Sequence, residues 1–152
     1  MSKIAILLGS KSDLPFVEAA EDYFKYFGLN YEVHVKSAHR NPAEVAEFCE
    51  NAPENGFSLI IAAAGMAAHL AGAAAAHTNL PILGVPLPGG IMDGMDALLS
   101  TVQMPAGVPV ATFAVGKAGM RNAAVFAAQV LALNDNDIKK RLDEFKKQGS
   151  RL

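Results

Sequence analysis

The sequence lacks the features that mark several large classes of protein. It has a single cysteine, Cys49, so an internal disulfide cannot form. Its 13 basic and 15 acidic side chains are scattered, and they form no basic stripe of the kind that binds nucleic acids or anionic membranes. We therefore expect small molecules as partners, with no nucleic acid and no membrane.

Long uninterrupted apolar runs are also missing. Residues 1–4 contain too short an apolar run for a signal peptide. The most apolar stretch, residues 59–87, is interrupted by polar residues and by Pro81, so it is expected to be a strand, a helix and a strand rather than a membrane span. These absences predict a cytoplasmic protein.

Alanine is the residue type that the sequence has in excess. The 152 residues suit one domain, spanning 1–152, and 51% of them are hydrophobic, with alanine supplying most of the surplus. Alanine favours close helix packing or contacts between subunits, so the composition is compatible with a homo-oligomer.

Apolar runs and helical spacing alternate along the chain. The continuous apolar run at residues 4–8 predicts a buried strand, and further strands are expected at residues 31–36, 58–64, 81–85 and 108–114. Helical spacing predicts helices at residues 13–27, 42–51, 67–77, 118–133 and 137–148. This order predicts an α/β fold: a three-layer αβα sandwich with a central parallel sheet, flavodoxin-like or Rossmann-like, plus a C-terminal helix.

Two helix starts carry capping signals. Ser12 or Asp13 can cap the first helix, and Asn41 with Glu44 is spaced as a capping box at the start of the second. Residues 86–107 contain several glycines and prolines, which predicts a long, partly helical functional loop.

In a sheet of this kind, ligands bind at the carboxyl ends of the strands. The loop after the first strand, Gly9–Asp13, offers backbone amides and a helix N-terminus to a phosphate. Asp13 would repel a phosphate, so helix capping or a ribose hydroxyl suits it better. The loop lacks the spacing of a nucleotide P-loop or a dinucleotide fingerprint, and a polar turn that binds nothing remains an alternative.

Two histidines lie in the loops that follow other strands. His39 can exchange a proton near neutral pH, and Arg40 beside it can hold a phosphate, although a solvated surface pair is the alternative. His69 lies among small residues that admit either a ligand or a packed helix. His34 and His77 are expected to be structural, and the spacing of the histidines and Cys49 predicts no metal site.

Four motifs in this order resemble the PurE family of purine biosynthesis over nearly the whole chain. They are Gly9-Ser10-Lys11-Ser12-Asp13, Ser37-Ala38-His39-Arg40, Ala67-Ala68-His69-Leu70 and Ser100-Thr101-Val102-Gln103-Met104-Pro105. Ala63 and Met66 depart from this resemblance, because glycine is common at both positions. The loop after Val85 also lacks the commoner serine-bearing sequence.

The resemblance implies one of two reactions. A mutase converts N5-carboxyaminoimidazole ribonucleotide to 4-carboxyaminoimidazole ribonucleotide, whereas a carboxylase forms the same product from aminoimidazole ribonucleotide and carbon dioxide. Arg40 and the segment Ala67–Leu70 resemble the mutase type, so the mutase is our prediction.

The same resemblance implies roles for individual residues. His39 is the expected catalytic residue, and no metal or other cofactor is implied. The family is octameric, with sites near subunit contacts, so a homo-octamer is expected. The expected substrate-binding residues are Gly9, Ser10, Asp13, Ser37, Arg40, Gly65 and His69.

Three other functions are alternatives to this one. A flavodoxin-like module that binds FMN would suit the fold and the first loop, and it would be yellow. A phospho-receiver domain needs acidic residues where this chain has Leu8–Gly9 and Ala64–Gly65, which argues against it. A purely structural oligomerisation domain would bind no aminoimidazole ribonucleotide.

Overall fold

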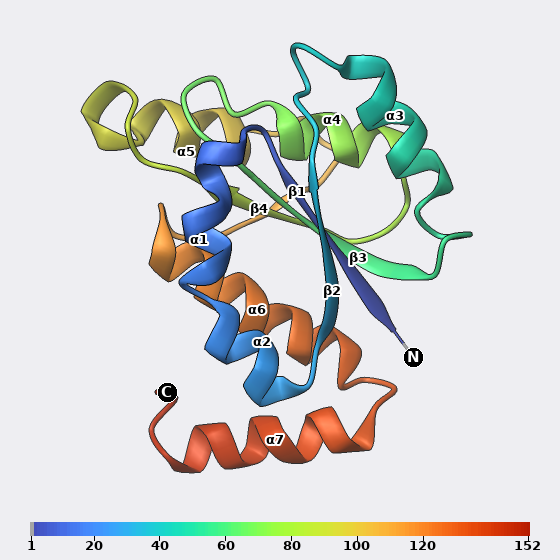
Figure 1. Ribbon diagram of the computed structural model, residues 1–152, viewed down its shortest axis with the longest axis vertical. Helices are drawn as coiled ribbons and strands as arrows, with labels where there is room; N and C mark the ends of the chain where they lie inside the picture. Colours follow the sequence, from blue (N-terminus) through green and yellow to red (C-terminus); the bar gives the residue numbers. More distant parts are fainter. Residues whose placement is uncertain (1) are drawn as a thin grey trace.

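A five-stranded parallel sheet forms the centre of the computed structural model, which describes residues 2–152 (Figure 1). Met1, the first residue of the expected domain, lies outside the described residues. The strands are β1 (Lys3–Leu8), β2 (Asn30–Val35), β3 (Phe57–Ala64), β4 (Ile82–Pro86) and β5 (Ala111–Thr112), in the order β2-β1-β3-β4-β5. Every neighbouring pair is parallel, which confirms the predicted α/β sandwich.

Helices cover both faces of the sheet (Figure 1). One face carries α1 (Leu14–Glu18), α2 (Glu21–Phe27) and α6 (Lys117–Leu131), with α7 (Asn136–Lys147) packed against α2 and α6. The other carries α3 (Pro42–Asn51), α4 (Leu70–His77) and α5 (Met95–Val102). Short 3₁₀ turns, η1 (Lys11–Asp13) and η2 (Ile91–Asp93), precede α1 and α5. No helix in residues 2–152 is long and apolar enough to cross a membrane.

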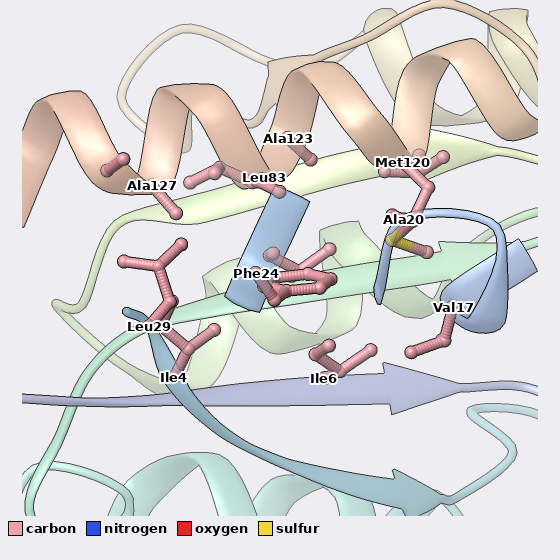
Figure 2. Packing of buried hydrophobic residues seen from close by; sticks show 14 of the residues in the cluster. Ile4, Ile6, Val17, Ala20, Phe24, Leu29, Leu83, Met120, Ala123 and Ala127 are labelled. Atoms are coloured by element: carbon pink, nitrogen blue, oxygen red, sulfur yellow. The ribbon is translucent and has the colours of Figure 1, made fainter. Parts of the chain in front are cut away.

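The strands separate two apolar cores, because successive side chains of a strand point to opposite faces. In β1, Ile4 and Ile6 face α2 and α6, whereas Ala5 and Leu7 face α3 and α4. Figure 2 shows Phe24 of α2 in one cluster with Ile4 and Ile6 of β1 and with residues of α6, and Phe24 is 1% exposed. The continuous apolar run of β1 therefore serves both cores.

A glycine in β4 allows α5 to approach the sheet closely. A Cβ atom at Gly84 would lie 2.5 Å from Cγ2 of Thr101 and 2.7 Å from Cγ1 of Val110, which is too close for real atoms. The absence of a side chain there lets Thr101 of α5, and Val110 just before β5, pack against the middle of β4.

One strand and one helix differ in length from the prediction. The expected strand 108–114 is only β5, at the edge of the sheet, because Pro109 has no amide hydrogen and pairing with β4 begins at Ala111. The expected helix 13–27 breaks between α1 and α2, where the guanidinium of Arg121 donates a hydrogen bond of 2.8 Å to the carbonyl of Ala19.

The helices after β2 and β3 start differently from the prediction. The predicted capping box at Asn41 does not form: the Asn41 side chain caps nothing, and Glu44 lies 3.5 Å from the ammonium of Lys36. Helix α4 starts at Leu70 rather than residue 67, because Met66 has a φ of 51° and interrupts helical geometry.

Candidate functional site

The strand order places a natural cleft between β1 and β3. The chain leaves β1 toward β2 on one side, and β3 and β4 extend the sheet on the other, so the connections diverge at this point. Loops at such a switch point stand apart at the carboxyl edge of the sheet and leave space for a ligand. All four loops that the sequence predicts to be functional, those after β1, β2, β3 and β4, begin at this edge.

The loop after β1 is ordered by its own side chains. Oγ of Ser10 accepts hydrogen bonds from the amide of Ser12 at 3.3 Å and from its hydroxyl at 2.9 Å. Oδ2 of Asp13 accepts one from the amide of Ser10 at 3.1 Å, which completes a capping box. Ser10 is thus the cap, and the prediction of a cap by Ser12 or Asp13 was wrong because η1 starts earlier than expected.

Asp13 has an unusual electrostatic position. Burial raises the pKa of its carboxyl above the usual value, and the hydrogen bond from the Ser10 amide opposes that rise. Gly9 precedes this turn without a positive φ, and a Cβ there would point between Ala64 and Asp13. The missing side chain therefore leaves room beside the carboxyl group.

The loop after β2 projects a histidine and an arginine into solvent. Oγ of Ser37 accepts a hydrogen bond of 3.1 Å from the amide of Arg40, and the carbonyl of Ser37 accepts one of 2.8 Å from the amide of Asn41. These bonds form a tight turn on which His39 and Arg40 are exposed. The Arg40 guanidinium makes no ion pair within residues 2–152, so it is available to an anion.

The loop after β3 brings a second histidine to the first. Nε2 of His39 lies 2.7 Å from Nδ1 of His69, and the two rings are nearly perpendicular at 88°. Between β3 and His69 the backbone passes through Gly65 and the left-handed residue Met66. A contact between residues 30 positions apart thus depends on an irregular turn.

These loops enclose one cavity of about 580 Å³. Every site residue that was predicted from the sequence lines this cavity except His69, which contacts His39. The lining residues are Gly9, Ser10, Ser12, Asp13, Ser37, His39, Arg40, Gly65, Met66, Pro88 and Gly89. Pro88 and Gly89 belong to the loop after β4, which the sequence predicted to be functional by the same rule about carboxyl ends, although no role was assigned to either residue.

Other parts of the molecule do not repeat this arrangement. Cavities of about 400 and 410 Å³ lie elsewhere, and neither brings a histidine and an arginine together. His34 packs on Phe48 with ring centroids 4.6 Å apart, and His77 lies 3.1 Å from Glu50. Within residues 2–152, no three side chains are grouped as metal ligands.

Comparisons with known proteins agree with the motifs. The family model described as AIR carboxylase matches residues 3–151. Proteins from Vibrio parahaemolyticus and Escherichia coli K12, both named N5-carboxyaminoimidazole ribonucleotide mutase, are 48% and 47% identical to this chain. Each match covers 96% of this chain, and 91% and 86% of the respective relatives.

A solved structure gives the same relationship in three dimensions. The crystal structure of Treponema denticola PurE superimposes with a TM-score of 0.88 and 25% identity, and the match covers 99% of this chain and 92% of that one. Fold, motifs and family model therefore agree over nearly the full length. This chain belongs to the AIR carboxylase family, the PurE family that its four motifs predicted.

Proposed function

We propose that this chain is an N5-carboxyaminoimidazole ribonucleotide mutase of purine biosynthesis. The reaction moves a carboxylate from the exocyclic nitrogen of the substrate to carbon 4 of its imidazole ring. The observation that carries the proposal is the single cavity in which an anion-binding loop, Arg40 and His39 converge. The near full-length relatives carry the name of this reaction.

The charged end of the ribonucleotide binds to the first two loops. The 3₁₀ turn after Ser10 offers amide and hydroxyl donors, and Arg40 supplies a cation with no competing carboxylate partner in the described chain. Asp13 accepts a hydrogen bond from a ribose hydroxyl, since its carboxylate would repel the phosphate. Ser37 and Gly9 shape the space between these groups.

His39 supplies the proton chemistry. In its protonated form it donates a proton to the exocyclic nitrogen, and the bond from that nitrogen to the carboxylate carbon breaks, releasing carbon dioxide. Carbon 4 then attacks the carbon dioxide. The neutral imidazole of His39 removes the carbon 4 proton, so the proton count of the enzyme is restored after each turnover.

The released carbon dioxide must stay beside carbon 4 until it reacts. Gly65 and Met66 line the same cavity as His39, and Ala68, farther along the same loop, is only 1% exposed. Small apolar residues hold few water molecules, and dry walls keep the carbon dioxide from hydration. Met66 is 66% exposed, so its side chain forms part of the cavity rim.

The proposal extends to the assembly. Exposed apolar side chains on and after η2, with Ile91 72%, Met92 79% and Leu99 50% exposed, support subunit contacts next to the site. By resemblance the assembly is a homo-octamer of single catalytic domains in the cytoplasm. The reaction as written uses no metal and no organic cofactor.

Direct carboxylation of aminoimidazole ribonucleotide is the second candidate, because the matching family model is described as AIR carboxylase. The same cavity would then hold free carbon dioxide from solution. The two candidates differ in the origin of the carboxyl carbon.

An isotope experiment separates them. The purified chain is given the N5-carboxylated substrate with ¹³C in its carbamate, in the presence of unlabelled bicarbonate, and the product is analysed by mass spectrometry. A mutase keeps the label in 4-carboxyaminoimidazole ribonucleotide and forms little product from aminoimidazole ribonucleotide plus bicarbonate. Product that forms efficiently only from the latter pair would replace the mutase with the carboxylase.

A further inference from the structure

The contact between His39 and His69 has a strict proton requirement. At 2.7 Å, Nε2 of His39 and Nδ1 of His69 are within hydrogen-bond distance, so one nitrogen must carry a hydrogen and the other a lone pair. The protonation of each ring is therefore linked to that of the other. The perpendicular arrangement, with ring centroids 4.9 Å apart, directs one ring edge at the other rather than stacking the faces.

His69 reaches the cavity through His39 and is not among the lining residues. Its backbone is firmly held, since its amide donates to the carbonyl of Ala67 at 2.9 Å and its carbonyl accepts from the amide of Ala73 at 2.8 Å. The flanking Ala68 and Leu70 are 1% and 2% exposed. The imidazole of His69 is thus attached to a fixed point of the sheet edge.

His39 has no comparable anchor of its own. It lies on an exposed turn, and the contact of its ring nitrogen with His69 is the side-chain hydrogen bond that the structure gives it. Asp13 and Arg40 are the charged residues that line the same cavity, and neither forms an ion pair with His39. The orientation of the His39 ring therefore depends on His69.

We propose that His69 is a positioning residue, which accepts a hydrogen bond from Nε2–H of His39 and leaves Nδ1 of His39 to exchange the proton with the substrate. This inference rests on the proposed function. With Nε2–H donated to His69 in both states, His39 gains and loses a proton at Nδ1 without turning its ring. One histidine can then act first as acid and later as base in a fixed orientation, as the reaction requires.

This role differs from the substrate contact expected for His69 from the sequence. A substrate contact would set the affinity, whereas a positioning contact sets the rate at which bound substrate reacts. The two roles therefore predict different kinetic effects of the same substitution.

Three substitutions at His69 test the proposal. In His69→Asn the amide group lies close to the original Nδ1 position and can still accept the hydrogen bond. His69→Gln places the amide farther out, near Nε2, and His69→Phe keeps the ring without any acceptor. Thermal unfolding of each variant checks the fold, which should persist because His69 is exposed.

We expect kcat of His69→Phe and His69→Gln to fall by about 10- to 100-fold with KM within about threefold of wild type, and His69→Asn to keep most of kcat. Proton NMR of the enzyme without substrate gives a second measurement. A downfield Nε2–H signal of His39, absent from His39→Asn, should persist in His69→Asn and disappear in His69→Phe.

Different results would contradict the positioning role of His69 and the proposed function. A large rise in KM at unchanged kcat would make His69 a substrate contact, and equal kcat in all three variants would overturn the positioning role. If wild type isomerises nothing, the proposed function fails. The NMR signal still decides the hydrogen bond in that case, and its persistence in His69→Phe would overturn the proposal.

Discussion

The two apolar cores and the carboxyl edge of the sheet are built on different principles. The strand residues of β1 that face the cores, from Ile4 to Leu8, are 0% exposed and belong to the two apolar clusters. At the edge, a few residues farther on, Ser10, His39 and Arg40 are exposed and polar. The buried residues that stabilise the fold and the residues of the proposed chemistry are thus different side chains, although the same strands position both.

The edge loops also differ from one another. The loop after β1 satisfies its own polar groups with a capping box between Ser10 and Asp13. The loop after β3 instead contains Met66 at a φ of 51°, a conformation that costs a side chain about 1–2 kcal/mol. The first loop is a rigid set of donors, and the third stores strain beside the cavity, which is typical of functional sites.

The substitution with the largest expected effect removes chemistry at the edge and leaves the cores intact. His39→Asn should lower the turnover by at least about 100-fold, because no proton donor and base remains. The free energy of unfolding should change by less than about 0.5 kcal/mol, since the ring is exposed. Isomerisation kinetics and urea titration measure the two quantities.

Calorimetry of nucleotide binding to His39→Asn provides the control, because binding should persist when the turnover is lost. Substantial isomerisation by this variant would remove His39 from its catalytic role. A large loss of stability would break the separation between edge and cores.

The converse substitution damages a core and spares the edge. Phe24→Ala should lower the free energy of unfolding by about 3–5 kcal/mol, because it removes a ring that is 1% exposed and packed 4.5 Å from Tyr31. Below its melting temperature the variant should keep kcat within a few-fold of wild type. Denaturant unfolding and the mutase assay check both expectations.

The same substitution elsewhere in the chain is the matched control. Phe126 is 38% exposed and contacts Phe113 with centroids 5.5 Å apart. Phe126→Ala should cost less than about 1.5 kcal/mol. Equal losses at Phe24 and Phe126 would contradict the assignment of stability to the buried layer.

The sequence predicted the layers well because burial imposes a period on it. The apolar run Ile4–Leu8 and the helical spacing of Phe24 and Phe27 describe one strand and one helix without tertiary information. The short β5 and the break near Ala19 depend on sheet pairing and on Arg121, which lies about a hundred residues away. Such contacts leave no periodic signal.

The sequence predicted residues that the fold brings to one cavity, but it did not predict their geometry. The rule that ligands bind beyond the carboxyl ends of parallel strands selected the loops, and the motifs supplied Ser10, Asp13, His39 and Arg40. The assignment of the cap to Ser10 and the contact of His39 with His69 depend on loop conformation. The residues of a loop follow no hydrophobic period, so the spacing of residues could not predict these two contacts.

The smallest expected effect concerns Asp13, where the edge loop approaches the buried layer. Because burial raises the folded-state pKa of Asp13 above its usual 3.8, the folded protein holds this proton more tightly than the unfolded chain. The resulting stabilisation is fully present below pH 3.8 and is lost as the pH rises through the higher folded-state pKa. Asp13→Asn keeps an acceptor for the Ser10 amide and removes the titration.

Wild type should therefore gain stability relative to Asp13→Asn as the pH falls through the folded-state pKa of Asp13 toward 3.8. The gain should stay below about 1 kcal/mol, since solvent screens a half-buried carboxyl. Urea titrations of both proteins at pH 7 and at successive acidic values measure the difference. If wild type instead loses stability relative to Asp13→Asn on acidification, the hydrogen bond from the Ser10 amide outweighs burial. The pKa of Asp13 is then lowered, and its carboxylate behaves like the exposed polar groups of the edge.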